Sequence, residues 1–195
     1  MGIEVAIARR KERVGNIKAA WLESFGQDAP SSFDLEIGCG KGHFLSAYAA
    51  AFPLRTCVGI DLISERIRDS ERRARMRSAA NAHFFKAEAS EFFEAVPGAL
   101  LDRVFILFPD PWPKKKHHRR RLMQKDFLDM LRAHCKSGSL MYFRTDHGEY
   151  FEWARALVEE NPAWKIGEAT DLPVDEVSQF QRILPKFSTL VAEAI

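Results

Sequence analysis

Apolar residues along this chain form short runs of strand length, which alternate with longer segments whose apolar positions recur at helical spacing. The runs predict strands at residues 33–37, 56–60, 82–86, 104–108 and 140–144. The segments between and after them predict helices at residues 44–52, 65–80, 91–96, 122–134 and 149–160. The fourth run, Val-Phe-Ile-Leu-Phe, is the most hydrophobic and therefore predicts a central strand.

Five strand–helix units in series predict a parallel sheet with helices on both faces, because the connections are long enough to carry a helix back across the sheet. Two further segments, residues 164–169 and 187–191, predict closing strands. No internal repeat or linker interrupts the pattern. We therefore expect a single doubly wound, Rossmann-like α/β domain over residues 1–195, with residues 1–30 as a helical, basic lead-in.

The composition is that of an ordinary globular chain, with 46% hydrophobic residues, 29% charged residues and a net charge of +2. Cys39, Cys57 and Cys135 match neither a metal-binding spacing nor a disulfide framework, so we expect reduced thiols and no metal. No segment approaches the ~18 apolar residues of a membrane span, and the start does not resemble a signal peptide. These features predict a soluble cytoplasmic protein, and leave a monomer and a homodimer both open.

The first predicted strand contains Glu36 and runs into a turn of spacing GxGxG, made by Gly38, Gly40 and Gly42. In open α/β sheets, ligands bind at the carboxyl ends of strands, and glycines let a ligand approach the backbone closely. A dinucleotide fingerprint would need a further glycine where the chain has His43. The turn therefore favours a ligand without phosphates, such as S-adenosylmethionine, whose ammonium group Glu36 could meet.

Acidic residues follow the next two predicted strands as well. Asp61, about 20 residues past the turn, is placed to accept hydrogen bonds from ribose hydroxyls. Glu88, after the third strand, is placed to meet an adenine amino group. The glycines alone could be a structural turn and the acids surface residues, but their order along the chain favours an S-adenosylmethionine site.

A proline-rich loop, Pro109-Asp110-Pro111-Trp112-Pro113, follows the fourth predicted strand. Prolines fix φ and remove amide donors, so the loop is stiff, which suits alignment of an acceptor atom with a methyl group. Trp112 offers a flat apolar surface. Asp110 is the candidate catalytic residue, because its carboxylate could accept the N1–H and N2–H2 donors of a guanine and favour positive charge on the methylated ring.

Eight consecutive cationic or titratable side chains, residues 114–121, follow this loop directly. Such a run is usually a solvated face, but its place beside the proposed active site favours binding of a nucleic-acid backbone. Asp146, after the fifth predicted strand, lies at the same predicted sheet edge. It could contact the substrate or only cap the following helix.

Together these motifs resemble the bacterial tRNA (guanine(46)-N7)-methyltransferases over residues 33–153. The glycine turn looks like the family's cofactor loop, and residues 108–122 look like its signature. The resemblance implies a class I methyltransferase fold of seven strands with the last antiparallel, S-adenosyl-L-methionine as cofactor and tRNA as partner. It also implies a cofactor pocket lined by Glu36, Asp61, Glu88 and Asp110, and substrate contacts from Lys114 and Asp146.

One departure from the family lies near the C-terminus, where a Thr-Lys-Phe-Glu motif that reaches the target guanine reads Pro185-Lys186-Phe187-Ser188 in this chain. We expect Lys186 and Ser188 to contact the substrate, while Thr189 and Glu193 lie close by in sequence. The leading prediction is methylation of guanine N7 in the tRNA variable loop. Methylation of another RNA or of an exocyclic amine, or a catalytically weakened tRNA-binding paralogue, are the alternatives.

Overall fold

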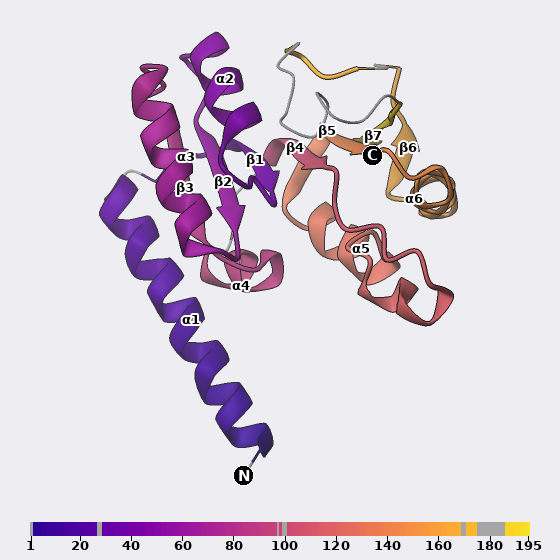
Figure 1. The fold of residues 1–195 in the computed structure, drawn as a ribbon, viewed down its shortest axis with the longest axis horizontal. Coiled ribbons are helices and arrows are strands. Elements are labelled where there is room, and N and C mark those ends of the chain that lie inside the picture. Colours follow the sequence, from indigo (N-terminus) through magenta and orange to yellow (C-terminus); the bar gives the residue numbers. More distant parts are fainter. Residues whose placement is uncertain (1, 27–28, 97, 99–100, 169–170, 175–185) are drawn as a thin grey trace.

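The computed structural model describes residues 2–26, 29–96, 98, 101–168, 171–174 and 186–195 (Figure 1). Its strands are β1 (Phe33–Ile37), β2 (Cys57–Asp61), β3 (Ala82–Lys86), β4 (Leu101–Leu107), β5 (Cys135–Thr145), β6 (Trp164–Ile166) and β7 (Ser188–Ala194). Its helices are α1 (Gly2–Phe25), α2 (His43–Ala51), α3 (Ser64–Met76), α4 (Ala89–Ala95), α5 (Lys125–Arg132), α6 (Gly148–Glu160) and the 3-10 helix η1 (Lys115–Arg120).

The strands form one seven-stranded sheet in the order β3-β2-β1-β4-β5-β7-β6. Strand β7 runs antiparallel to both of its neighbours, and the other pairs are parallel. The predicted α/β class, the antiparallel last strand and the central place of β4 are thereby confirmed. In chain order, the strands proceed outward from β1 to β3 on one side of the sheet, and then outward from β4 on the other side. The carboxyl ends of β1 and β4 therefore form the switch point where ligands bind in such folds.

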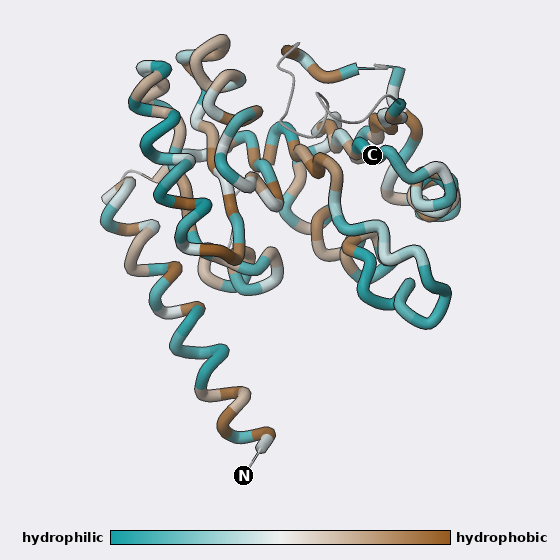
Figure 2. Tube along the Cα trace, in the orientation of Figure 1, coloured by the Kyte–Doolittle hydropathy of each residue, from teal (hydrophilic) through white to brown (hydrophobic). Residues whose placement is uncertain are grey.

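Helices cover both faces of the sheet, because alternate residues of each strand point to opposite sides. On β4, Val104 and Ile106 belong to the apolar cluster under α1, α4, α5 and α6, whereas Phe105 belongs to the cluster under α2 and α3. In the trace coloured by hydropathy, α3 on the outside of the sheet is largely hydrophilic, whereas α2 beside it is more apolar (Figure 2).

The observed bounds differ from the predicted ones where backbone geometry intervenes. Strand β4 ends at Leu107 because Phe108 adopts a φ of 53°, in the left-handed region. Helix α3 stops at Met76, close to Ser78, whose φ is 56°. Strand β5 is 11 residues long and reaches back to Cys135, which pairs with Leu101 at the start of β4. The basic run, for which the pattern predicted no element, forms η1.

Helix α1 is 24 residues long, but only Ile17 and Trp21 are buried, and its first half extends beyond the sheet (Figure 1). The Trp21 ring packs within 6 Å of the rings of Phe33, Phe85 and Phe92, which anchors the second half of the helix. None of the helices in the described part of the chain combines the length and apolarity that a membrane crossing needs.

Candidate active site

The glycine turn after β1 is held in a left-handed backbone by Gly38, Gly40 and Gly42, with φ values of 76°, 56° and 68°. A Cβ on Gly42 would lie 2.7 Å from the Cβ of Ser70 on α3, so close packing requires this glycine. Apart from the glycine and its two chain neighbours, no atom of the described residues lies within 4 Å of a Cβ added to Gly38 or Gly40. The outer side of the turn is therefore open to a ligand that approaches the backbone.

Glu36 lies near the end of β1 and is 4% exposed. Its Oε2 atom is buried and accepts no hydrogen bond from the part of the chain that the structure describes. Burial raises the pKa of Glu36 to about 8, a backbone hydrogen bond at Leu45 opposes this shift, and the charge of Asp61 adds to it. Buried polar atoms in native proteins have partners, so an unpartnered carboxylate oxygen indicates a place for a ligand donor, such as an ammonium group.

A cavity of about 280 Å³ joins the glycine turn to the proline-rich loop. It brings together four of the predicted residues, Glu36, Gly38, Gly40 and Asp110, at the switch point of the sheet. Side chains that the sequence interpretation did not assign complete it, namely Lys41, His43, Phe44, Arg66, Leu107 and Phe108.

Asp61, at the end of β2, is tied to the backbone on both sides. Its Oδ2 atom accepts a hydrogen bond from the Gly40 N–H at 3.0 Å, and its Oδ1 atom accepts one from the Ile63 N–H at 2.9 Å. The guanidinium of Arg66, from the first turns of α3, lies 3.5 Å from Oδ2. Asp61 therefore connects the glycine turn to the start of α3, beside the cavity.

Glu88 caps helix α4, a role that the sequence interpretation did not predict. Its Oε2 atom accepts hydrogen bonds from the N–H groups of Ser90 and Glu91 at 3.0 and 3.3 Å. It lines a second cavity of about 430 Å³ with Leu62 and Ala87, at the carboxyl ends of β2 and β3, and not the one that contains Glu36.

The loop after β4 holds Asp110 between two strained residues. Phe108 and Trp112 adopt φ values of 53° and 44°, although neither is a glycine. Asp110 is exposed, lines the smaller cavity and makes no hydrogen bond or ion pair with the described residues. The Trp112 ring packs against η1, with the Arg120 guanidinium 5.0 Å above it.

Arg121 joins this loop to α6 through its buried side chain. Its side chain is 0% exposed, its Nε donates to the Pro111 carbonyl oxygen at 2.8 Å, and its two terminal nitrogens donate to Glu149 of α6 at 3.2 and 2.8 Å. The guanidinium also lies over the rings of Tyr150 and Trp153, at 4.9 and 5.3 Å. The sequence pattern gave no signal for the contacts with Glu149, Tyr150 and Trp153, because they join residues 28 or more positions apart in the sequence.

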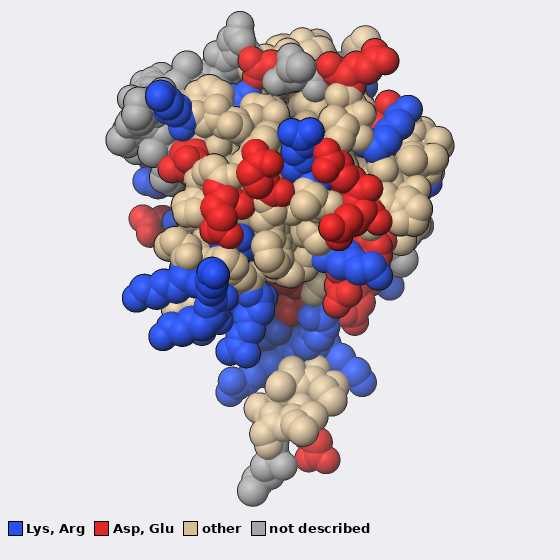
Figure 3. Space-filling view, turned by 90° about the vertical axis from the view of Figure 1, so that its right-hand side faces the viewer, with Lys and Arg blue, Asp and Glu red and all other residues tan. Residues whose placement is uncertain are grey.

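The basic run extends over the surface beside this loop. The exposed members, Lys114, Lys115, Lys116, Arg119 and Arg120, form no ion pair with the described residues. The space-filling view of this side shows Lys and Arg side chains gathered in its lower part (Figure 3). A cluster of basic side chains without ion-pair partners is suited to binding a polyanion.

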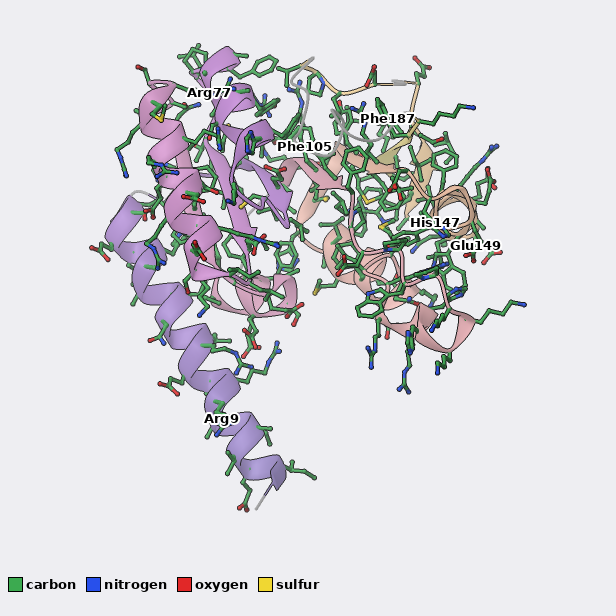
Figure 4. The ribbon with its side chains drawn as sticks, in the orientation of Figure 1. Arg9, Arg77, Phe105, His147, Glu149 and Phe187 are labelled. Atoms are coloured by element: carbon green, nitrogen blue, oxygen red, sulfur yellow. The ribbon has the colours of Figure 1, made fainter. Side chains whose placement is uncertain are left out.

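Asp146 and the C-terminal motif lie at the same sheet edge, next to the end of β5. Asp146 is exposed, and helix α6 is capped by His147, whose Nδ1 atom accepts from the Tyr150 N–H at 3.2 Å, so the capping alternative for Asp146 is wrong. Figure 4 shows His147 and Glu149 together at the start of this helix. Lys186 and Ser188 are exposed, and Ser188 pairs with Thr145.

Phe187 connects the C-terminal motif to the proline-rich loop, because its ring centroid lies 6.1 Å from that of Phe108. Pro185 lies outside the described residues. Both residues near the lost Thr and Glu have partners within the chain: Thr189 accepts a hydrogen bond from Arg144 at 2.8 Å, and Glu193 pairs with Lys165 at 2.9 Å.

The three cysteines are buried free thiols, as predicted. Within the described ranges, no group of three or more His, Cys, Asp or Glu side chains could hold a metal ion.

Solved structures with this architecture include methyltransferases. TrmN from Thermus thermophilus aligns with a TM-score of 0.62 and 19% identity, over 91% of this chain and 48% of that protein. The 16S rRNA methyltransferase KamB aligns with a TM-score of 0.59 and 18% identity, over 84% of this chain and 87% of that one. These likenesses show that the chain has a Rossmann-like α/β fold that methyltransferases also have.

Sequence comparison narrows this class to one family. Residues 31–194 match the methyltransferase family Methyltransf_4. The tRNA (guanine-N(7)-)-methyltransferase of Streptococcus mutans is 32% identical over 177 residues, which cover 88% of this chain and 82% of that protein. The corresponding enzyme of Caulobacter vibrioides is 33% identical over 148 residues, 74% of this chain and 66% of that protein. The chain belongs to this family of tRNA (guanine-N7)-methyltransferases.

Proposed function

We propose that this protein transfers a methyl group from S-adenosyl-L-methionine to N7 of guanine 46 in the variable loop of tRNA, in the cytoplasm. The observation that carries the proposal is one cavity that contains both an unpartnered buried carboxylate, Glu36, and an exposed carboxylate on a stiff loop, Asp110. The names of the family relatives supply the acceptor, a guanine N7 in tRNA.

The residues at the switch point fit S-adenosyl-L-methionine. Glu36 would accept the ammonium group, the open turn at Gly38 and Gly40 would take the amino-acid end, and Asp61 would accept ribose hydroxyls. Leu62 and Glu88 line the neighbouring cavity, which would hold the adenine. The cofactor supplies a methyl group bonded to a positively charged sulfur.

Asp110 would orient the acceptor base and stabilise the charge that develops on it. Guanine N7 carries a free lone pair, so no residue has to remove a proton. Methylation at N7 would leave a positive charge on the ring, which the carboxylate of Asp110 would stabilise. Accepting the N1–H and N2–H2 donors would hold the base in line, and the prolines on both sides of Asp110 would limit its motion.

The exposed cations of η1 would hold the tRNA backbone beside the cavity, and Lys114, Asp146, Lys186 and Ser188 would contact the RNA near the target base. All four side chains are exposed at the carboxyl edge of β4 and β5 or next to it. Salt should therefore weaken tRNA binding steeply.

Two transcripts of one tRNA that differ only at position 46 test the proposal. With labelled S-adenosyl-L-methionine, we expect transfer to the transcript with guanine 46 and none to the transcript with adenine 46. Equal labelling of both transcripts, or labelling of neither, would contradict the proposed acceptor.

A further inference from the structure

The cavity at the switch point presents charges of both signs to the same space. Glu36 offers a buried carboxylate oxygen that has no hydrogen-bond partner among the described residues, and Arg66 offers a guanidinium whose side chain is 48% exposed. An amino-acid group carries an ammonium and a carboxylate on one carbon atom. A ligand with such an end needs both a carboxylate and a cation within reach in its site.

Arg66 is the cation of this cavity that a ligand would displace, because its partner, Asp61, is itself proposed to bind the ligand. Its guanidinium lies 3.5 Å from Oδ2 of Asp61, the residue proposed to accept ribose hydroxyls. Lys41, the other long cation of the lining, is held by Asp69 of α3 at 3.3 Å. Asp61 also accepts two backbone hydrogen bonds, so the loss of Arg66 does not leave its carboxylate without partners.

We propose that Arg66 exchanges partners when the cofactor binds: ribose hydroxyls replace it on Asp61, and its guanidinium moves to the carboxylate of the amino-acid end. Arg66 is then a binding residue that recognises this carboxylate, opposite Glu36, which takes the ammonium. This inference rests on the proposed function, since it takes S-adenosyl-L-methionine as the ligand.

The partner exchange predicts that loss of Arg66 changes the affinities of two ligands differently, although both ligands contain the same adenosine part. S-adenosylhomocysteine carries the amino-acid end, whereas 5′-methylthioadenosine does not. In Arg66→Ala, S-adenosylhomocysteine loses a charge-assisted hydrogen bond, and its Kd should rise about tenfold. The Kd of 5′-methylthioadenosine should stay the same or fall, because Asp61 no longer has to release Arg66.

Calorimetric titration of both ligands into wild-type and variant protein gives the two dissociation constants. Arg68→Ala is the matched control, because Arg68 is an exposed arginine of the same helix that does not line the cavity, and both constants should match wild type. Arg66→Gln provides a second variant with a polar side chain of similar length, and should show the same pattern as Arg66→Ala.

Equal weakening of both ligands in the Arg66 variants, or no change in either, would overturn the partner exchange while leaving the proposed function in place. Wild-type protein that binds neither ligand would instead contradict the proposed cofactor, and with it the function. The two failures are therefore distinguishable in the same set of titrations.

Discussion

Glu36 and Asp110 lie in one cavity but in opposite surroundings. Glu36 is enclosed, and its pKa is raised to about 8 by burial, whereas Asp110 is exposed on a loop. The two carboxylates can therefore have different roles. A buried carboxylate favours a positively charged ligand group that compensates its charge, whereas an exposed carboxylate can receive an incoming base.

Substitution of Glu36 should change how stability depends on pH. The folded protein keeps Glu36 protonated up to a pH of about 8, whereas the unfolded chain releases this proton above its ordinary pKa of 4.5. The stabilisation from the protonated group is therefore complete below pH 4.5 and is lost as the pH rises through about 8. Glu36→Gln cannot ionise. Its midpoint of thermal unfolding should match wild type at pH 5 and exceed it at pH 8.5.

Thermal unfolding of Glu36→Gln and of the exposed control Glu65→Gln, followed at both pH values, checks this prediction. A constant difference between Glu36→Gln and wild type across the pH range would contradict the raised pKa.

Asp110→Asn keeps the shape of the side chain but removes its charge and adds an N–H donor. We expect the single-turnover rate of methyl transfer to fall about 100-fold, because the amide can no longer accept both guanine donors or balance the charge on the ring. The Kd of S-adenosylhomocysteine should change less than about threefold, since Glu36, Gly38 and Gly40 remain. Asp126→Asn, at an exposed position of α5, should behave as wild type; an unchanged rate in Asp110→Asn would remove this residue from the chemistry.

At the scale of elements, the loop after β4, η1 and the start of α6 form one unit around Arg121. The sequence predicted a stiff loop from its prolines, but stiffness alone does not place Asp110. The buried guanidinium does so, because it joins the Pro111 carbonyl to Glu149 of α6. This role could not be predicted from the basic run, in which Arg121 looks like its seven exposed or half-exposed neighbours.

Arg121→Ala should lower the free energy of unfolding by roughly 2–3 kcal/mol, since it leaves a buried void and a carbonyl oxygen without its donor. Urea unfolding of this variant can be compared with that of Arg155→Ala, which removes an exposed arginine that pairs with Glu159 on the same helix α6. The Arg155 variant should be close to wild type. Equal stability of the two variants would show that Arg121 does not hold the loop.

Helix η1 carries the predicted electrostatic contact with tRNA. Replacing Lys114, Lys115 and Lys116 by Gln should weaken tRNA binding and lower the slope of log Kd against log salt by about 2–3, at ~0.7–0.9 per lost phosphate contact. A control that replaces Lys18, Lys125 and Lys165, exposed lysines of other elements, should leave the slope unchanged. Identical slopes for the two triple variants would exclude η1 from the RNA interface.

For the whole molecule, the sequence predicted the order of strands and helices well, because strands such as β1 and β2 are buried runs bounded by polar or turn residues. The bounds of β1 and β3 agree with the predicted ones. What the sequence could not predict depends on contacts between distant segments. The pairing of Cys135 with Leu101 extends β5, and the hydrogen bonds of Arg121 to Glu149 join the proline-rich loop to α6.

The sequence also predicted part of the candidate site, namely the residues that strand order brings together. Glu36, Gly38, Gly40 and Asp110 share the cavity because strand order alone brings the carboxyl ends of β1 and β4 together. The capping role of Glu88 and the partners of Arg121 required the packing of helices, which a periodic pattern does not encode.

Methyl transfer by the wild-type protein from labelled S-adenosyl-L-methionine to unmodified tRNA, followed by identification of the labelled base, tests the central claim most directly. The account predicts label in N7-methylguanine at position 46, despite Pro185 and Ser188 in the C-terminal motif. Label in another base or at an exocyclic amine, or no transfer by protein that binds the cofactor, would contradict it.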